Sequence, residues 1–152
     1  MLYQKLTSDL KDAMKSGDGF KVGVLRMLAS AFHNKEIEKK GKKLDPILSE
    51  EEAIEILFRE TKKRKEAMEI FTKAGRNDLA EKELKELEII KKYLPEQLGE
   101  EEIEKNIKAA IEKIGANNIK DFGKVMAEAM KELKGRADAS LVSGILKKQL
   151  NG

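Results

Sequence analysis

The sequence predicts an all-α protein, with a helical N-terminal domain that contains two long antiparallel helices and a small three-helix C-terminal module. Its apolar residues recur almost everywhere at helical spacing, and not at the alternating spacing of half-buried strands. Only two of the 152 residues are proline, so few positions forbid a helix. Glycines fall where the apolar periodicity breaks, which is where helices are expected to end.

The first two predicted helices are separated by a glycine turn. Apolar residues at every fourth position form the expected stripe of the first helix: Leu2, Leu6, Leu10 and Met14. The pattern stops before Gly17 and Gly19, which predicts a turn there. A second stripe then predicts the next helix: Val22, Leu25, Leu28, Ala29 and Phe32. This helix is expected to fade through residues 36–40, because Pro46 in the following loop cannot continue it.

Two long helices are predicted next. Ser49 and Glu52 have the spacing of a capping box, so the third helix is expected to begin there. Its expected stripe is Ala53, Ile54, Leu57, Phe58, Met68 and Phe71. Gly75 is placed to end this helix in a left-handed turn, and Asn77 is placed to cap the fourth helix. The stripe of the fourth helix is Leu79, Leu84, Leu87, Ile90 and Leu94, before Pro95.

Beyond Pro95 the predicted helices are shorter, and we place a domain boundary there, giving domains 1–96 and 97–152. One helix carries Ile103, Ile107, Ile111 and Ile114 and is closed by Gly115. The next carries Phe122, Val125, Met126, Ala129, Met130 and Leu133 and is closed by Gly135. The last has a candidate cap at Asp138 and carries Leu141, Val142, Ile145 and Leu146.

The composition excludes several classes of protein. There is no cysteine, so disulfides, thiolate metal sites and a cysteine nucleophile are all excluded, and a reducing cytoplasm is the expected location. Charged residues begin at Lys5 and Asp9, before any signal-like apolar run, and no stretch approaches the ~18 apolar residues of a membrane span. We therefore expect a soluble protein that does not contact membranes.

No constellation of residues points to catalysis, to a metal or to a cofactor. His33 is the only histidine. It shares a helix face with Glu36 at the spacing of half a di-iron site, but the second histidine of such a site does not exist. Gly17 and Gly19 resemble the start of a phosphate loop, yet Val22 occupies the position of its third glycine. We expect no catalytic residue, no metal ligand and no bound cofactor.

Most charges are interpreted as solvated helix faces. The formal net charge of +3 is the small difference between 31 basic and 28 acidic residues. Many acidic residues precede a basic residue by one helical turn, and such pairs add only ~0.2–0.5 kcal/mol each. These pairs are Glu55 with Arg59, Glu60 with Arg64, Glu81 with Lys85, Glu88 with Lys92, and Glu104 with Lys108. The basic run Lys62–Lys65 is interpreted in the same way, as an exposed face of a long helix.

The C-terminal module has a polarised charge. Residues 99–112 carry a net charge of −3, with five acidic and two basic residues. From Lys113 onward there are eight basic and four acidic residues, a net charge of +4. We expect these cations to lie on one side of the module, where they favour contact with phosphates. The absence of interleaved aromatic residues argues against base stacking on single strands.

Three strings closely resemble the GatB/YqeY family. They are KRKEAMEIFTKAGRNDLAEKELKELEIIKKYLPEQL at 63–98, FGKVMAEAM at 122–130 and KGRADASLV at 134–142. The resemblance covers nearly the whole chain and fits the free-standing YqeY-like members. The last module is similar to the tail domain of the B subunit of the glutamyl/aspartyl-tRNA amidotransferase, which implies contact with the elbow of tRNA.

The resemblance and the basic charge together select the candidate nucleic-acid-binding residues: Lys124, Lys131, Lys134, Gly135, Arg136, Lys147 and Lys148. Lys134 and Arg136 can meet phosphate oxygens, and Gly135 permits close approach of the backbone. The free N–H groups at the start of the last helix would add partial positive charge. An equally good interpretation makes Gly135 and Asp138 a plain C-cap and N-cap pair.

The leading hypothesis is a non-catalytic tRNA-associated protein that recognises RNA shape through backbone contacts. No DNA binding is expected. One alternative is an accessory role in a glutamine-dependent tRNA amidotransferase, a carbon–nitrogen ligase with glutamine as amido-N-donor, beside an amidase or synthetase subunit. Another is a helical module that binds a protein between its long helices. The catalytic parts of the amidotransferase have no counterpart here, so the chain is not expected to perform amidotransfer alone.

Overall fold

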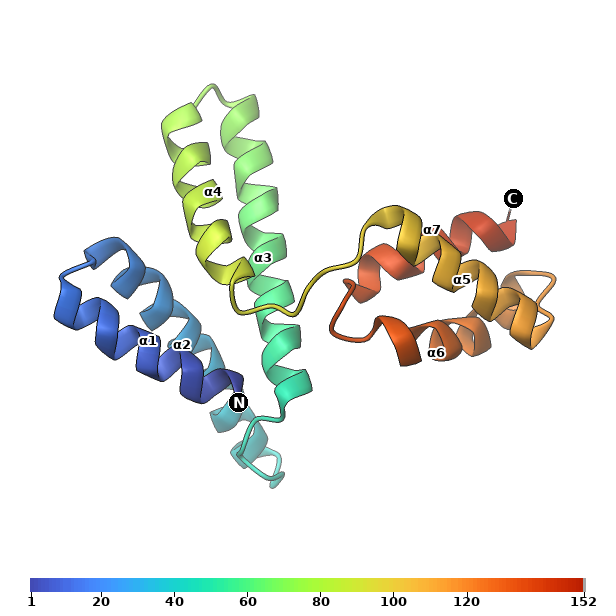
Figure 1. Cartoon of the computed structure of the whole chain (residues 1–152), viewed down its shortest axis with the longest axis horizontal. Coiled ribbons are helices and arrows are strands. Elements are labelled where there is room, and N and C mark those ends of the chain that lie inside the picture. Colours follow the sequence, from blue (N-terminus) through green and yellow to red (C-terminus); the bar gives the residue numbers. More distant parts are fainter. Residues whose placement is uncertain (152) are drawn as a thin grey trace. The chain divides into compact units, whose positions relative to one another are not determined.

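A computed structural model describes residues 1–151, which form seven α-helices, one short 3₁₀ helix and no strand (Figure 1). The all-α prediction is confirmed. Contacts divide the chain into two compact units, Met1–Leu94 and a second that begins at Pro95. No helix among the described residues combines the length and the apolar character that crossing a bilayer requires.

The N-terminal unit consists of two helical hairpins. The first pairs α1 (Leu2–Ser16) with α2 (Gly19–Gly41), and the second pairs α3 (Glu50–Lys73) with α4 (Asn77–Lys91). Gly17 closes α1 with a φ of 74°, a left-handed conformation that glycine adopts without the penalty a Cβ imposes. The core lies where the hairpins meet, and its largest fully buried side chains are Leu6, Leu25, Leu28, Phe32, Leu57 and Ile90.

The stripe predicted for α1 is wrong at its end. Met14 is 46% exposed, whereas Ala13 is buried. Four residues turn an α-helix by more than one full revolution, so a stripe at every fourth position drifts around the helix. By the third repeat the drift carries Met14 out of the interface and brings Ala13 into it.

The capping box at the start of α3 is confirmed. The Glu52 N–H donates to Ser49 Oγ at 3.1 Å, and the Ser49 N–H donates to the Glu52 carboxylate at 2.9 Å. Lys39 Nζ donates to the same carboxylate at 2.7 Å. These bonds, that of Lys39 first, lower the pKa of Glu52. They tie the end of α2 to the beginning of α3 across the loop.

The cap predicted for α4 is wrong by one residue. Gly75 adopts the expected left-handed conformation, with a φ of 71°. Arg76, not Asn77, is the N-cap, because its carbonyl accepts the first bonds of the helix, from the N–H groups of Leu79 and Ala80. Asn77 is already helical, and Arg76 places its guanidinium on Asp78 instead, at 3.2 Å.

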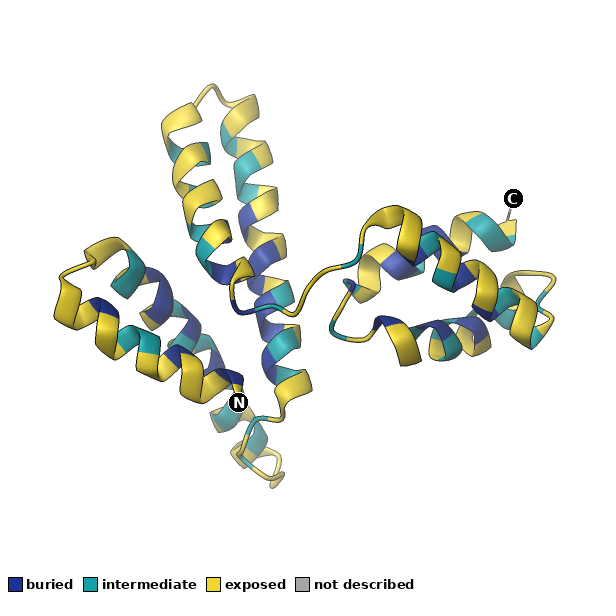
Figure 2. Cartoon of the chain, in the orientation of Figure 1, coloured by how far each residue is buried: buried dark blue, intermediate teal, exposed yellow. Residues whose placement is uncertain are grey.

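The distal half of the α3–α4 hairpin is only partly covered. Between residues 65 and 86, all of which the structure describes, no side chain is buried, and Figure 2 shows the tip of the hairpin in yellow and teal. The predicted stripe residues Met68 and Phe71 are half-buried, and Leu84 is 40% exposed. Only two helices meet there, and two helices cannot enclose a core.

The surface pair predicted for Glu60 and Arg64 is wrong in its location. Both side chains are buried in the N-terminal unit, together with Thr61. The remainder of the basic run, Lys62, Lys63 and Lys65, is exposed as expected. Of the five expected one-turn pairs, Glu81 with Lys85 lies on the surface at 3.5 Å. The described residues include no ion pair for Glu55 with Arg59, Glu88 with Lys92 or Glu104 with Lys108.

The second unit is a three-helix bundle with a short connection. It comprises α5 (Glu100–Ile114), the 3₁₀ helix η1 (Ile119–Asp121), α6 (Phe122–Leu133) and α7 (Ala139–Asn151). Its separate core contains Ile103, Ile107, Ala110, Val125, Ala129, Leu133, Ala137, Val142, Ile145 and Leu146. Leu141, which was predicted to join this core, is 45% exposed because it precedes the inward-facing Val142 by about 100° of helix.

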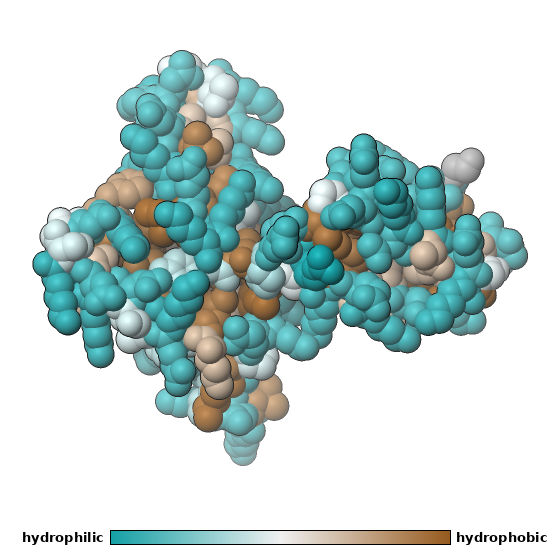
Figure 3. Space-filling model, in the orientation of Figure 1, coloured by the Kyte–Doolittle hydropathy of each residue, from teal (hydrophilic) through white to brown (hydrophobic). Residues whose placement is uncertain are grey.

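Polar atoms cover most of the visible surface of each unit, and apolar atoms show mainly in patches between helices (Figure 3). This distribution is expected for a chain in which 39% of the residues are charged.

Candidate nucleic-acid interface

The turn between α6 and α7 carries three of the predicted contact residues. Gly135 has a φ of 76°, and the N–H groups of Arg136 and Ala137 both donate to the Leu133 carbonyl at 3.0 Å. Gly135 therefore ends α6 in the manner of a glycine cap. At the other end of the turn, Asp138 Oδ1 accepts from the Ser140 N–H at 3.0 Å.

The Asp138 bond affects the expected anion site at the start of α7. A carboxylate already lies in the first turn and accepts one of the free N–H groups there. It also supplies the negative charge that the helix dipole attracts. The start of α7 is thus served by the protein itself, and the capping interpretation of Gly135 and Asp138 describes the geometry.

The segment that precedes α5 fixes the same turn from its other side. The Leu98 N–H donates to the Arg136 carbonyl at 2.9 Å, and Gln97 Nε2 donates to the Gly135 carbonyl at 3.1 Å. Gln97 Nε2 also donates to the Pro95 carbonyl at 2.6 Å. These bonds satisfy the turn's carbonyls internally, and the Arg136 side chain is left exposed on a fixed backbone.

A second group of charges lies on the outer side of α6. Lys124 and Lys131 are seven residues apart and therefore share one face of the helix. Glu128 lies between them and receives Lys131 Nζ at 2.7 Å and Lys113 Nζ, from α5, at 2.5 Å. The two ammonium groups, Lys113 first, lower the pKa of Glu128 to about 2. Part of the predicted positive surface is thus neutralised by a shared carboxylate.

A third group lies at the opposite end of α6. Lys147 Nζ is 5.8 Å from the centre of the Phe122 ring, within the range of a cation–π contact. Lys148 is its exposed neighbour on α7. Phe122 and Leu133 mark the two ends of α6, which at 1.5 Å per residue lie about 16 Å apart.

The structure thus places the seven predicted residues in three groups along α6, and not in one cluster. Lys134, Gly135 and Arg136 form the turn, Lys124 and Lys131 flank Glu128, and Lys147 and Lys148 lie near Phe122. Among the described residues, Lys124, Arg136 and Lys148 form no ion pair. Each of these three side chains is exposed.

Metal-binding geometry is not found in residues 1–151. No three His, Asp or Glu side chains come together there as a metal site would require. His33 and Glu36 form an isolated surface contact on α2, with Nδ1 and Oε2 separated by 3.4 Å.

Comparison with known proteins identifies the family. The family model described as "Yqey-like protein" matches residues 3–150. The chain belongs to the YqeY-like family.

Curated relatives agree with this membership. "Altered inheritance of mitochondria protein 41, mitochondrial" of Pyrenophora tritici-repentis is 31% identical over 146 residues, which cover 94% of this chain and 77% of the relative. The protein of the same name from Lachancea thermotolerans is 33% identical over 151 residues, 95% of this chain and 78% of the relative. That of Saccharomyces cerevisiae strain YJM789 is 36% identical over 110 residues, 70% and 57% respectively.

These names overturn the predicted cytoplasmic location. Relatives that align with nearly the whole YqeY-like chain are named as mitochondrial proteins. The prediction rested on the absence of cysteine. That absence excludes disulfides, but it does not distinguish one reducing compartment from another.

Sequence reasoning missed two parts of this surface of the YqeY-like chain. Glu128 joins Lys113 on α5 to Lys131 on α6, a pairing between helices that spacing along one helix does not reveal. Gln97 and Leu98 donate to backbone carbonyls, which every residue possesses, so no side-chain pattern marks their partners. Both features depend on how the three helices assemble.

Proposed function

We propose that this YqeY-like protein is a non-catalytic RNA-binding protein whose C-terminal unit contacts the phosphates of tRNA. The observation that carries the proposal is the set of three exposed cations, Lys124, Arg136 and Lys148, which form no ion pair among the described residues. They belong to a segment whose net charge is +4 from Lys113 onward. Cations without internal partners can release counterions from a polyanion at little cost to the fold.

The spacing of the groups supports recognition of a folded RNA. The turn around Arg136 and the region around Lys148 lie at the two ends of α6, about 16 Å apart along the helix. Double-helical RNA presents a regular array of phosphates and 2′-hydroxyl groups over such distances, and proteins read it by shape. The similarity of this unit to the tail domain of a tRNA amidotransferase subunit selects tRNA among the folded RNAs.

Base stacking has no platform in this unit. Phe122 is the only aromatic residue after Tyr93, and its ring is half-buried beneath Lys147. Proteins that bind single strands without sequence preference stack successive bases on exposed aromatic rings. The unit is therefore expected to prefer tRNA to an unstructured RNA strand of equal length.

The proposal is tested by fluorescence anisotropy with a tRNA transcript at low and moderate salt. The test variant combines Lys124→Ala with Arg136→Ala. The matched control combines Lys105→Ala with Lys108→Ala, which removes the same charge from exposed positions on the acidic helix α5. We expect the test variant to lose about tenfold or more in affinity and about one unit of salt slope per phosphate contact. The control should stay within about twofold of the wild type.

Two results would contradict the proposal. One is the absence of tRNA binding by the wild-type protein at about 50 mM salt, where phosphate contacts are strongest. The other is an equal loss in the test and control variants, which would reflect net charge alone. Co-purification with an amidase or synthetase subunit after nuclease treatment, without direct tRNA binding, would favour the accessory role instead.

A further inference from the structure

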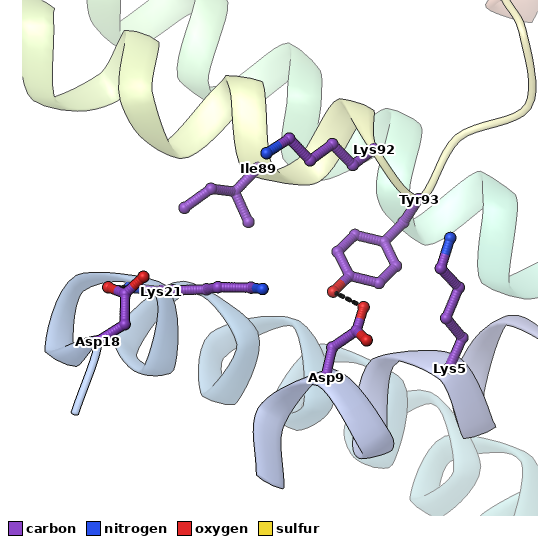
Figure 4. A pocket seen from close by; sticks show the side chains of 7 residues that line it. All are labelled: Lys5, Asp9, Asp18, Lys21, Ile89, Lys92 and Tyr93. Carbon is purple, nitrogen blue, oxygen red and sulfur yellow. Dashed lines mark hydrogen bonds between the residues drawn. The ribbon is translucent and has the colours of Figure 1, made fainter. Parts of the chain in front are cut away.

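The N-terminal unit contains a cavity of about 380 Å³ between α1, α2 and the end of α4 (Figure 4). Lysines from all three segments line it, namely Lys5, Lys21 and Lys92. Asp9, Asp18, Ile89 and Tyr93 complete the lining. The volume lies within the range of small-molecule sites, at its lower end.

The two carboxylates of the cavity already have hydrogen-bond partners within the protein. Asp9 Oδ2 accepts from the Tyr93 hydroxyl at 2.6 Å. Asp18 is the N-cap of α2, and its Oδ1 accepts from the Lys21 N–H at 3.0 Å. Each acid therefore has a structural role that fixes its position.

The lysines are less committed than the acids. Neither Lys21 nor Lys92 forms an ion pair with any described residue, although the sequence predicted one between Lys92 and Glu88. Lys5 Nζ lies 5.6 Å from the centre of the Tyr93 ring. Figure 4 shows Lys21 extending from α2 toward Asp9 and the Tyr93 hydroxyl, while Lys92 lies beside Ile89. The cavity thus has more cationic donors than its own acids use.

The donor set fits a phosphate better than a carboxylate. Arginine recognises a carboxylate with two parallel bonds in one plane, and no arginine lines this cavity. Lysines act as separate point charges, which suit the diverging oxygens of a tetrahedral phosphate. A phosphate dianion also offsets the lysine charge that remains beside Asp9 and Asp18.

The cavity is larger than a phosphate group needs, and its remaining wall is partly apolar. Ile89 is half-buried on one side, whereas Tyr93 is only 6% exposed and offers no free ring face for stacking. We propose that this cavity binds a small organic phosphate, with its phosphate group between Lys21 and Lys92 and its organic part against Ile89. The site is separate from the RNA-binding surface proposed above, because its lining comes entirely from the N-terminal unit.

The test uses the full 17.1 kDa chain, labelled with ¹⁵N, and follows each backbone amide by NMR. The probes are adenosine 5′-monophosphate, inorganic phosphate and adenosine, all at constant ionic strength. We expect the nucleotide to cause saturable shifts confined to amides near residues 5–9, 18–22 and 89–93. Inorganic phosphate should shift the same amides with weaker affinity, and adenosine should not.

The variant Lys21→Gln with Lys92→Gln should weaken nucleotide binding about tenfold or more, since each hydrogen bond to a charged group contributes that order of affinity. The matched control is Lys11→Gln with Lys15→Gln, at exposed positions of α1 outside the cavity. It should bind as the wild type does. Binding should also strengthen as the pH rises through about 6, where the phosphate loses its second proton.

Several results would overturn the inference. Equal binding of adenosine and the nucleotide would mean that the phosphate is not recognised. Equal binding by the two double variants would assign the effect to net charge. Shifts at these amides with tRNA but not with the nucleotide would make the cavity part of an RNA surface, and loss of tRNA binding by the C-terminal variant would leave this inference untouched.

Discussion

Arg64 Nη1 donates to the Glu60 carboxylate at 2.6 Å, and these two charged side chains are 9% and 6% exposed in the N-terminal unit. The same guanidinium places Nη2 3.1 Å from Met27 Sδ on α2 and Nε 3.3 Å from a Glu86 oxygen on α4. The Nε contact has the distance of an ion pair but not the alignment of a hydrogen bond. One side chain therefore links three helices.

Removing one partner of this pair should strongly destabilise the N-terminal unit. Glu60→Ala leaves the Arg64 charge buried with an incomplete set of partners, and the expected loss is about 3 kcal/mol or more. Lys65→Ala, on the exposed side of the same helix, should change stability by at most about 0.5 kcal/mol. Urea unfolding followed by tyrosine fluorescence measures this unit alone, because Tyr3 and Tyr93 are the only two tyrosines and both belong to it.

A Glu60→Ala loss as small as that of Lys65→Ala would show that the pair is open to water in solution. The double replacement Glu60→Leu with Arg64→Met provides a further comparison. Buried ion pairs replaced by apolar side chains of similar volume often keep or gain stability. The double variant should therefore be more stable than Glu60→Ala.

The hydrogen bond between Tyr93 and Asp9 should stabilise the contact of α4 with α1. Tyr93→Phe removes a bond to a charged acceptor, and the expected cost is about 1–2 kcal/mol, because the half-buried Asp9 can recruit water instead. Tyr3→Phe, at a position that is 39% exposed, is the control. Thermal unfolding measures both changes.

The titration of Tyr93 gives a second test of the same contact. Burial, followed by the Asp9 carboxylate, raises the pKa of Tyr93 well above 10. The folded state therefore binds the phenolic proton more tightly than the unfolded state, and this stabilisation is lost as the pH rises above about 10. In the Tyr3→Phe variant Tyr93 is the only tyrosine, and its phenolate absorbance should appear only above that pH. A phenolate that forms at the ordinary tyrosine pKa would contradict the contact.

Glu128 should restrain the proposed RNA-binding surface. Glu128→Gln removes the carboxylate shared by Lys113 and Lys131, so both ammonium groups become available to phosphates. Affinity for tRNA should rise severalfold, with a steeper salt dependence. Glu112→Gln changes the net charge equally from an exposed position on α5 and should have a smaller effect. Equal effects of the two variants would exclude a specific role for Glu128.

The same carboxylate makes stability depend on pH. The pKa of Glu128 lies at about 2 in the folded protein, below its ordinary value of 4.5. The stabilisation is thus fully present above about pH 4.5 and is lost as the pH falls toward about 2. Acid unfolding followed by circular dichroism should show a shallower acid loss for Glu128→Gln than for the wild type.

Two glycines of the first hairpin should respond oppositely to alanine. Gly23 lies inside α2, and a Cβ there meets nothing within 4 Å, so Gly23→Ala should stabilise the helix by up to about 1 kcal/mol. Gly17 has a φ of 74°, and Gly17→Ala should cost about 1 kcal/mol or more. Thermal unfolding of the two variants checks the pair, and a change in the same direction for both would contradict the assigned backbone conformation.

The fold could be predicted from sequence wherever local chemistry decides the structure. Gly75 and Gly115 end helices because their left-handed conformation is cheap only for glycine, and the Ser49–Glu52 box is complete within four residues. The prediction was wrong where neighbouring helices decide. Met14 is displaced from its core by helical drift, and Leu84 is exposed because only one helix packs against α4 at that point.

The candidate site was predictable in total charge and not in its distribution. Counting residues gives the net charge of +4 from Lys113 onward. It does not show that Lys131 shares Glu128 with Lys113, or that Lys147 lies over Phe122. In the same way, the spacing of Glu60 and Arg64 is identical to that of a surface pair. Their burial follows only from the approach of Met27 and Glu86, which lie far away in the sequence.

The bonds from Gln97 and Leu98 to the α6–α7 turn decide where the C-terminal unit can be cut from the chain. A fragment that starts at Gly99 has every helix of the bundle but lacks both donors, so the Gly135 and Arg136 carbonyls lose their partners. A fragment that starts at Pro95 retains the complete set. Work on the isolated bundle should therefore begin its expressed product at Pro95 or earlier, or the loop that presents Arg136 will be studied without its brace.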